Sequence, residues 1–436
     1  MKLLDFIVDN EDKAIISDDD SITFREILEI SSSNQDVLDC LRGIKVSFAG
    51  NGSADLAVLL SILDGIASEI LLVPTDFGSG QVESIESRAD SSCRVSLENQ
   101  RVVVDQLKVA PKNLASDTKW IVPTSGTTGL PKLVIHSLAS LTKTLKRDCI
   151  TGRYFCWGLS YEISRFAGLQ VFLQSITTGA SVCIPPDGCS VAEKVNFYIK
   201  HGANIISATP SFWRAALMVR NVDELDLRRI TLGGEIADKN VLDALASKFS
   251  ECKIVHIYAS TEAGVGFTVQ DCRPGFPIEY LEGAHGDVEI KVKGDKLFLK
   301  SNNSSDGYID KGLIVDEDGF LDTGDLVEIV KDRVTFLGRA SGLINVGGNK
   351  VYPEMVESIL LNHVDVLDCK VYAKDNPIVG SLVCADVVTG LSASEFGVFK
   401  KNLINFCSDK LLSYQIPRFL NKVDSITKNS AGKIIR

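Results

Sequence analysis

The chain has 436 residues, of which 45% are hydrophobic and 24% are charged, a balance that is typical of globular proteins and excludes a largely disordered chain. Since a single hydrophobic core rarely serves a chain of this length, we expect a large domain and at least one smaller one. A formal net charge of -11 disfavours a nucleic-acid partner, because phosphate backbones are bound by basic surfaces.

Targeting signals and metal-binding patterns are weak in this sequence. The apolar run at the start of MKLLDFIVDNEDK is broken by Asp5 and is too short for a secretory signal. The most apolar stretch, residues 56–74, contains Asp64 and Glu69, so we expect no membrane span. The 11 cysteines are scattered without a CxxC pair and the five histidines lie far apart, which predicts reduced cysteines and no metal cluster. These features predict a cytoplasmic protein.

Short β-branched runs alternate with helical patterns through the first two thirds of the chain. Strand-like residues 44–49 and 70–73 flank a helical stretch at residues 54–66. A second helical stretch at residues 239–249 precedes a strand at residues 255–258. This alternation is typical of parallel sheets with crossover helices.

From residue 286 the pattern changes to alternating, turn-rich segments such as DVEIKVKGDKLFLK. Gly294 and Asp295 in this segment fit a hairpin turn between two strands, which predicts a β-rich subdomain. After Arg339 the pattern becomes mixed, with helices expected at residues 353–361 and 394–411 and strands at residues 370–372 and 382–388.

The predicted fold class is therefore α/β. A large N-terminal domain over residues 1–338 combines parallel βαβ sheets with the β-rich subdomain. Residues 339–341 form the boundary, and residues 342–436 form a small α+β domain. No low-complexity linker separates the two parts, so we expect them to be joined tightly.

The strongest motif is a nine-residue loop that follows the strand-like residues 120–122 and consists of Thr124, Ser125, Gly126, Thr127, Thr128, Gly129, Leu130, Pro131 and Lys132. Glycines let a backbone approach phosphate oxygens, hydroxyl groups add hydrogen-bond donors, and Lys132 adds a positive charge. The spacing differs from a Walker loop, which requires GxxxxGK followed by Ser or Thr. A plain Ser/Thr/Gly surface loop is the alternative, which the specific order of nine residues disfavours.

This loop resembles the signature loop of the adenylate-forming enzymes, which include acyl-CoA synthetases, aryl-CoA ligases, luciferases and the adenylation domains of peptide synthetases. Further matches follow in the family's order and cover nearly the whole chain: YASTE at residues 258–262 resembles YGxTE, LDTGDL at 321–326 resembles the TGD motif, Gly338-Arg339 resembles the start of the hinge, and NSAGK at 429–433 resembles the terminal GK. In compactness the chain is most similar to short members such as o-succinylbenzoate-CoA ligase.

The resemblance implies a role for each matched residue, and the chemistry of each side chain suits that role. Tyr258 would pack on adenine, a flat surface that an aromatic ring can cover. Glu262 would hold Mg²⁺, a hard cation that prefers carboxylate oxygen. Thr261 would reach the α-phosphate, and Asp325 would accept hydrogen bonds from both ribose hydroxyls. Arg339 would bind the ribose and phosphate side through its guanidinium fork.

Lys433 is the residue that the resemblance assigns to the first catalytic step. A carboxylate that attacks the α-phosphorus of ATP and expels pyrophosphate brings negative charges together, so catalysis is mostly positioning and charge stabilisation. The resemblance also implies that the small domain rotates about a hinge at residues 339–341, withdraws Lys433 and opens a tunnel for pantetheine. The predicted catalytic residues are Lys433, Glu262 and Thr261; the predicted nucleotide-binding residues are Thr124, Ser125, Gly126, Thr127, Thr128, Gly129, Lys132, Gly234, Glu235, Tyr258, Ala259, Ser260, Asp325 and Arg339; and Gly233 and Arg165 are assigned to the acyl substrate.

Three positions depart from the family's pattern. Ala259 replaces the glycine of YGxTE, and Ser341 stands at the hinge position that is usually Asp or Lys. Phe166 stands where peptide-synthetase domains place an Asp that holds an α-ammonium group. An α-amino acid substrate is therefore disfavoured.

Arg165 stands where similar short synthetases carry a His beside the acyl pocket. A guanidinium is costly to bury without an anionic partner. That partner is either a polar group of the substrate or phosphopantetheine, or it is Glu162, which is three residues earlier and would lie on the same face if the segment is helical.

Several other residues have a structural interpretation. His136 and His256 lie in apolar strand-like runs and are interpreted as core histidines whose hydrogen bonds are satisfied. Trp213 is interpreted as core packing.

The leading functional hypothesis is an acyl-CoA synthetase that uses ATP, Mg²⁺, a carboxylic acid and CoA. An alternative is a ligase that loads the phosphopantetheine of an acyl carrier protein, with the same adenylation chemistry. A third hypothesis is a non-catalytic nucleotide-binding homologue, which the intact residues Lys433, Glu262, Asp325 and Arg339 disfavour.

Overall fold

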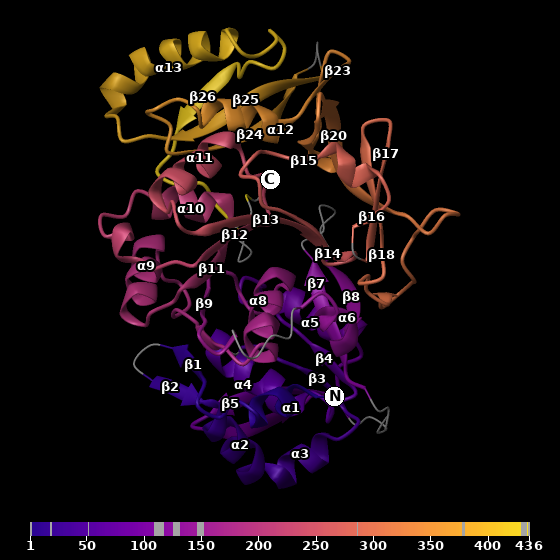
Figure 1. The fold of residues 1–436 in the computed structure, drawn as a ribbon. Coiled ribbons are helices and arrows are strands. Elements are labelled where there is room, and N and C mark those ends of the chain that lie inside the picture. Colours follow the sequence, from indigo (N-terminus) through magenta and orange to yellow (C-terminus); the bar gives the residue numbers. More distant parts are fainter. Residues whose placement is uncertain are drawn as a thin grey trace.

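Four sheets organise the computed structural model of this chain (Figure 1). It describes residues 2–17, 20–50, 52–108, 117–124, 131–145, 152–285, 287–376, 380–428 and 434. Three sheets and their helices form a large N-terminal body, and the fourth sheet with two helices forms a smaller C-terminal body. This arrangement confirms the predicted α/β class with a large and a small domain.

The seven-stranded sheet carries the ends of the predicted phosphate loop. Its strand order is β19-β8-β7-β4-β3-β5-β6. The strands are β3 (Lys45–Ser47), β4 (Glu69–Leu71), β5 (Cys93–Glu98), β6 (Arg101–Gln106), β7 (Lys119–Thr124), β8 (Lys132–Ser137) and β19 (Gly307–Tyr308). The strands β5, β3, β4 and β7 are parallel, and the pairs β5–β6, β7–β8 and β8–β19 at the two edges are antiparallel. The short strand β19 comes from far along the chain and brings Tyr308 next to β8.

The helices described in the first 142 residues are α1 (Leu3–Val8), α2 (Phe24–Ser33), α3 (Gln35–Leu41), α4 (Ser53–Leu63), α5 (Ser79–Arg88) and α6 (Leu138–Thr142). Helix α4 is apolar on nearly all sides and is buried along its length from Leu56 to Leu63, as a helix inside a core must be. Helix α2 begins with a capping box in which the Thr23 hydroxyl accepts from the Glu26 N–H.

The eight-stranded sheet holds the YASTE motif, in the order β14-β13-β12-β11-β9-β10-β1-β2. Its strands are β1 (Ala14–Ser17), β2 (Asp20–Thr23), β9 (Cys156–Leu159), β10 (Ser181–Cys183), β11 (Ile205–Ala208), β12 (Arg229–Gly233), β13 (Lys253–Ser260) and β14 (Gly264–Val269). Its helices are α8 (Phe166–Thr177), α9 (Val191–Lys200), α10 (Pro210–Ala216) and α11 (Lys239–Lys248). Six central strands are parallel, which confirms the predicted βαβ pattern, and only the edge strands β2 and β14 are antiparallel.

The predicted β-rich subdomain is an antiparallel six-stranded sheet in the order β15-β21-β20-β18-β17-β16. The strands are β15 (Phe276–Pro277), β16 (Ala284–His285), β17 (Val288–Lys293), β18 (Lys296–Ser301), β20 (Leu321–Val330) and β21 (Arg333–Arg339). The expected hairpin is confirmed, with Lys293 paired to Lys296 across a two-residue turn. Gly294 has φ +64° in this turn, a value that favours glycine.

The C-terminal body has its own hydrophobic core and follows a single turn, η3 (Ala340–Gly342). Its elements are β22 (Ile344–Val346), β23 (Asn349–Val351), α12 (Pro353–Leu360), β24 (Asp368–Asn376), β25 (Gly380–Val388), α13 (Ala393–Ser408) and β26 (Phe419–Lys422). In Figure 1 this body, drawn in yellow, lies beside α11, where Asn240 donates a hydrogen bond to Asn362. The predicted boundary falls at the η3 turn, and the hinge motion stays a prediction. Within the described ranges, no helix is long and apolar enough to cross a membrane.

Candidate active site

Three of the predicted nucleotide-binding residues meet where two sheets adjoin. Tyr258 lies near the end of β13, while Asp325 on β20 is paired in register with Arg339 at the end of β21. The Tyr258 hydroxyl donates to Asp325 Oδ2, and Arg339 Nε lies 2.9 Å from Asp325 Oδ1. Both carboxylate oxygens of Asp325 therefore have a donor, as expected of a group that accepts two hydrogen bonds.

The Tyr258 ring is part of an aromatic stack. It lies parallel to Phe267, with ring centres 5.1 Å apart and planes 12° apart, and to Phe336, at 5.3 Å and 8°. Burial and the charge of Asp325 raise the pKa of Tyr258 well above its ordinary value, so its hydroxyl is a donor at neutral pH. The predicted packing of Tyr258 on adenine stays a prediction. The Tyr258 ring stacks on Phe267 and Phe336, two phenylalanines that the sequence pattern did not single out.

Glu262 is held by a tyrosine that the motifs did not reveal. The Tyr308 hydroxyl donates to Glu262 Oε1 at 3.1 Å. The ammonium nitrogen of Lys132 lies 5.4 Å from the centre of the Tyr308 ring, within the range of a cation–π contact. Tyr308 therefore contacts both the end of the phosphate loop and the predicted metal ligand.

His136 forms a hydrogen bond with the main chain of Thr261, the residue before Glu262 in the YASTE motif. Its Nε2 lies 2.8 Å from the carbonyl oxygen of Thr261, and its Nδ1 lies 3.3 Å from Ser140 Oγ. The ring also stacks on Phe166, the first residue of α8, at 5.6 Å. Burial lowers the pKa of His136 to about 4, so the ring is neutral at pH 7. The interpretation as a satisfied core histidine is confirmed.

Gly233, which is assigned to the acyl substrate, ends β12 and lies opposite Ile257 of β13, and the predicted nucleotide-binding residues Gly234 and Glu235 follow it. Gly234 has φ +81°, which favours glycine, and the Glu235 carboxylate accepts a hydrogen bond from the Ser211 N–H at 2.9 Å. The structure therefore brings this segment beside Tyr258.

Two of the other side-chain interpretations have different outcomes. Trp213 is completely buried and its indole N–H lies 3.4 Å from the Thr231 carbonyl, which confirms core packing. His256 is only partly buried, and its Nε2 lies away from solvent without a hydrogen-bond partner. The prediction of a satisfied core histidine is therefore wrong for Nε2 of His256, although the ring also has a hydrogen bond with the Arg273 backbone and burial lowers its pKa to about 4.

Arg165 has a partner that the local sequence does not show. Its guanidinium Nη2 donates to Asp76 Oδ1 at 2.6 Å, and its Cζ lies 5.1 Å from the centre of the Phe77 ring. The expected pair with Glu162 is present only as a 3.9 Å contact. Arg165 precedes α8 as its N-cap, so the expected helical face for that pair is wrong. The Glu162 carboxylate instead accepts from the Thr75 N–H and the Ser164 hydroxyl, both at 2.6 Å.

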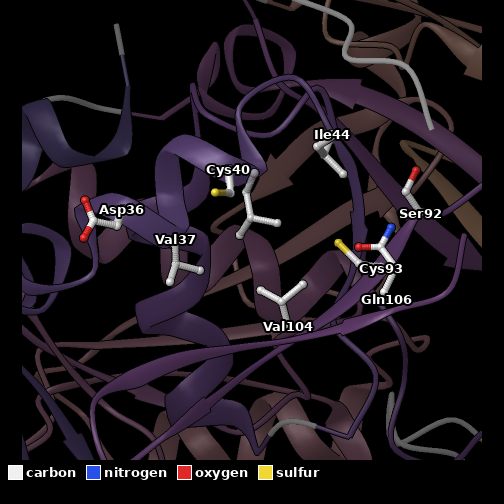
Figure 2. Close-up of a pocket in the computed structure, with 9 residues that line it drawn as sticks. Asp36, Val37, Cys40, Ile44, Ser92, Cys93, Val104 and Gln106 are labelled. Carbon is white, nitrogen blue, oxygen red and sulfur yellow. The ribbon is translucent and has the colours of Figure 1, made fainter. Parts of the chain in front are cut away.

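The described residues of the N-terminal body line at least two pockets. One, of about 650 Å³, opens at the carboxyl ends of β3 and β4 and includes Thr75 and Phe77, which also surround Arg165 and Glu162. The other, of about 400 Å³, lies between α3 and the β5–β6 hairpin (Figure 2). Its lining contains none of the predicted site residues: Asp36, Val37, Cys40, Leu41, Ile44, Ser92, Cys93, Val104 and Gln106.

Several predicted residues lie outside the described residues, namely Lys433 and the loop residues Ser125, Gly126, Thr127, Thr128 and Gly129. The two ends of the loop are described: Thr124 closes β7 and Lys132 opens β8, and they are paired in register. Ala259 and Ser260 adjoin Tyr258 in β13, and the Ser260 hydroxyl accepts from the Ala263 N–H at 3.0 Å.

Residues 43–298 match the AMP-binding enzyme family, and residues 355–433 match the C-terminal domain of AMP-binding enzymes. The first match alone spans more than half of the chain. The chain belongs to the AMP-binding enzyme family. This membership agrees with the order of the motifs and with the meeting of their residues at one place in the fold.

Two proteins with similar sequences are named as CoA ligases. A 2-succinylbenzoate–CoA ligase of Bacillus cytotoxicus is 25% identical over 470 residues, covering 97% of this chain and 94% of the relative. Peroxisomal OPC-8:0-CoA ligase 1 of Arabidopsis thaliana is 29% identical, covering 73% of this chain and 63% of the relative. The family match shows an AMP-binding enzyme, and both of these relatives are named as CoA ligases.

Solved structures show the same fold. The anthranilate CoA ligase AuaEII, in complex with anthranoyl-AMP, has a TM-score of 0.80 at 16% identity and covers 100% of this chain, with 95% of its own chain matched. The o-succinylbenzoate CoA synthetase of Bacillus subtilis, in complex with its acyl-adenylate intermediate, has a TM-score of 0.76 at 20% identity, covering 99% and 96% of the two chains.

Proposed function

We propose that the meeting of Tyr258, Asp325 and Arg339 is the nucleotide end of the adenylation site. Asp325 would exchange its present donors for the ribose hydroxyls, and Arg339 would turn from Asp325 toward the ribose and phosphate side. The observation that carries this proposal is that both residues, 14 positions apart, face each other across one β-ladder beside the YASTE motif. A carboxylate and a guanidinium so placed offer the acceptor and donor set that a ribose phosphate requires.

Glu262 is the residue proposed to hold Mg²⁺. One of its carboxylate oxygens accepts from Tyr308, and a carboxylate has further acceptor capacity on its second oxygen. Mg²⁺ usually takes one or two carboxylates and completes its shell with water and phosphate oxygens, so a single glutamate suits it. When bound, the ion supplies positive charge to the phosphate oxygens. Among the residues with described positions, no cluster of three or more acidic, His or Cys side chains forms a dedicated metal cage.

The chemistry of the first step follows from charge. The carboxylate of the acid attacks the α-phosphorus of ATP, the bond to pyrophosphate breaks, and an acyl-AMP results. Thr261 is proposed to reach the α-phosphate, with its main chain fixed by His136. Lys433 is proposed to stabilise the developing charge, so Lys433→Ala should reduce acid-dependent pyrophosphate release by roughly 10²–10³-fold. Thioester formation from pre-made acyl-AMP should fall far less, and equal losses in both half-reactions would contradict this role.

The acceptor in the second step is proposed to be CoA, whose thiol attacks the acyl carbon and releases AMP. The η3 turn after Arg339 is the proposed hinge for the change between the two steps. A carrier-protein phosphopantetheine would use the same chemistry and is an outcome of the test below. A cytoplasmic location is part of the proposal, in keeping with the ten free cysteines of the described residues.

Arg165 bears on which acid is used. Its charge is already matched by Asp76 and Glu162, so the three side chains carry one net negative charge when all are ionised. A second carboxylate on the acid would gain little from a guanidinium in this setting. We therefore favour an acid without a second carboxylate at this end of the pocket.

The deciding experiment is a panel of carboxylic acids assayed for pyrophosphate release from MgATP. The panel should contain aromatic, aliphatic and dicarboxylic acids of matched length, and the best acid is then tested with CoA and with a holo carrier protein. Release that depends on the acid, followed by thioester formation with CoA, is the expected result. Release without added acid, or none with any acid in the presence of Asp325, Glu262 and Lys433, would overturn the proposal.

A further inference from the structure

Two cysteines touch each other in the eight-stranded sheet, away from the residues assigned to the nucleotide. Cys156 opens β9 and Cys183 closes the neighbouring parallel strand β10. The register pairs Cys156 with Ser181 and Gly158 with Cys183, so the two thiols project from one face of the sheet, one diagonal step apart. Their sulfur atoms are 3.3 Å apart.

The two thiols differ in their access to solvent. Cys156 is partly exposed, whereas Cys183 is completely buried at 0% exposure. Both lie near one acceptor, the carbonyl oxygen of His201, at 3.9 Å and 4.0 Å from the two sulfur atoms. Cys156 is therefore the more exposed residue of the pair, and Cys183 lies beside it inside the sheet.

The electrostatic setting favours ionisation of the exposed partner. The hydrogen bond from Cys183 lowers the pKa of Cys156, and the charge of Lys13 acts in the same direction. The contact with Cys156 and burial raise the pKa of Cys183 far above its ordinary value. Although burial opposes this lowering, a cysteine with a lowered pKa beside a buried thiol is the usual arrangement of an attacking and a resolving cysteine.

We propose that Cys156 and Cys183 are a modification site that a hydroperoxide converts into a disulfide. The Cys156 thiolate attacks one peroxide oxygen, the O–O bond breaks, and the departing hydroxide leaves as water once it is protonated. The Cys183 sulfur then attacks the sulfenic sulfur, the S–O bond breaks, and a second water leaves with the Cys183 proton. Two thiols lose two electrons, and one hydrogen peroxide is reduced to two waters.

The position of the pair makes the bond formation feasible and reversible. The sulfur atoms already lie 3.3 Å apart, so they must approach by roughly 1 Å to reach the disulfide length of about 2 Å. A disulfide between neighbouring strands requires the two Cα atoms to come within about 7 Å. Cys156 is the more exposed residue of the pair, so a reducing thiol would reach the bond from its side.

The test is peptide mapping of the folded full chain after exposure to equimolar hydrogen peroxide and alkylation of the remaining thiols. Trypsin cleaves after Arg153, Arg165 and Lys194, so Cys156 is released on residues 154–165 and Cys183 on residues 166–194. A linked pair of these peptides is expected without reduction, and dithiothreitol should restore two thiols per chain.

Cys189 lies on the same tryptic peptide as Cys183 and provides the matched control. The linked pair should persist in Cys189→Ser and be absent in Cys183→Ser and in Cys156→Ser. The last variant changes a partly exposed residue and keeps the test usable if Cys183→Ser does not fold. Recovery of Cys156 as an unlinked sulfinic acid with Cys183 alkylated would overturn the proposal, as would a link that survives in Cys183→Ser. Neither readout requires the substrates, so this test is independent of the proposed function.

Discussion

Acidification should destabilise the large domain through His136. This imidazole is completely buried, and burial lowers its pKa from 6.5 to about 4, although the Thr261 carbonyl and the charges of Asp306 and Glu262 act in the opposite direction. In the unfolded chain the imidazole is hydrated and binds its proton near pH 6.5. Between pH 6.5 and about 4 the unfolded state therefore holds more protons, so the free energy of unfolding falls as the pH falls.

The size of this loss follows from the two pKa values. A difference between 6.5 and about 4 corresponds to about 3 kcal/mol of unfolding free energy, because one pKa unit is worth about 1.4 kcal/mol. The pKa of His256 is also lowered to about 4, chiefly by burial, so a second loss occurs in the same pH window. His136→Gln removes the first titrating group and keeps an N–H donor that can reach the Thr261 carbonyl. The variant should lose about 3 kcal/mol less than the unmodified chain between pH 7 and pH 4.

Urea unfolding at a series of pH values, followed by tryptophan fluorescence, measures this difference. All three tryptophans, Trp120, Trp157 and Trp213, lie in the large domain, so the signal reports its unfolding. His256→Gln should likewise reduce the fall in unfolding free energy between pH 7 and pH 4, and the double variant should remove the contributions of both histidines. Parallel pH profiles for the unmodified chain and the variants would refute the reasoning, because they would show that burial does not keep these imidazoles neutral.

Three further changes test other parts of the site. Ser341→Pro should slow thioester formation more than adenylation, because proline fixes φ near -65° in the proposed hinge. If the variant slows both steps by the same factor, or neither, the hinge lies elsewhere. Tyr308→Phe removes a hydrogen bond to the Glu262 carboxylate and should raise the Mg²⁺ concentration for half-maximal adenylation roughly tenfold with little change in melting temperature. An unchanged Mg²⁺ requirement would argue against this positioning. Arg165→Ala should cost about 2 kcal/mol of unfolding free energy and leave the ranking of acids unaltered, whereas a reordered ranking would show direct contact with the acid.

Much of the fold could be predicted from local sequence patterns, because the periodicity of apolar residues reflects which side of each helix or strand is buried. The β17–β18 hairpin was predictable because a glycine at a two-residue turn is a local requirement. The alternation of strands and helices also predicted the parallel core of the eight-stranded sheet. The antiparallel edge strand β19 was not predictable, because its two residues lie in a polar, turn-rich stretch and pair with β8 only in the folded chain.

The site was predictable to the extent that its residues belong to continuous motifs. The meeting of Asp325 with Arg339 and Tyr258 agrees with roles inferred from those motifs, although the roles themselves stay predictions. The partners Tyr308 and Asp76 were missed, since each is joined to its target by tertiary packing across 46 and 89 positions. The sole local hint for Tyr308 was an aromatic residue within a polar turn, which is a weak signal by itself.

The pairing of Arg165 with Asp76 restricts the routes by which this sequence can diverge. Loss of Arg165 alone leaves the carboxylates of Asp76 and Glu162 near each other, and loss of Asp76 alone removes the shorter of two ion pairs from a guanidinium that is only 7% exposed. A chain that has changed only one of the two residues is therefore less stable, whereas a chain in which both have become neutral avoids this cost. Descendants of this chain should therefore change the two positions together, and a correlated substitution would mark the point in a lineage where this end of the protein acquired a different lining.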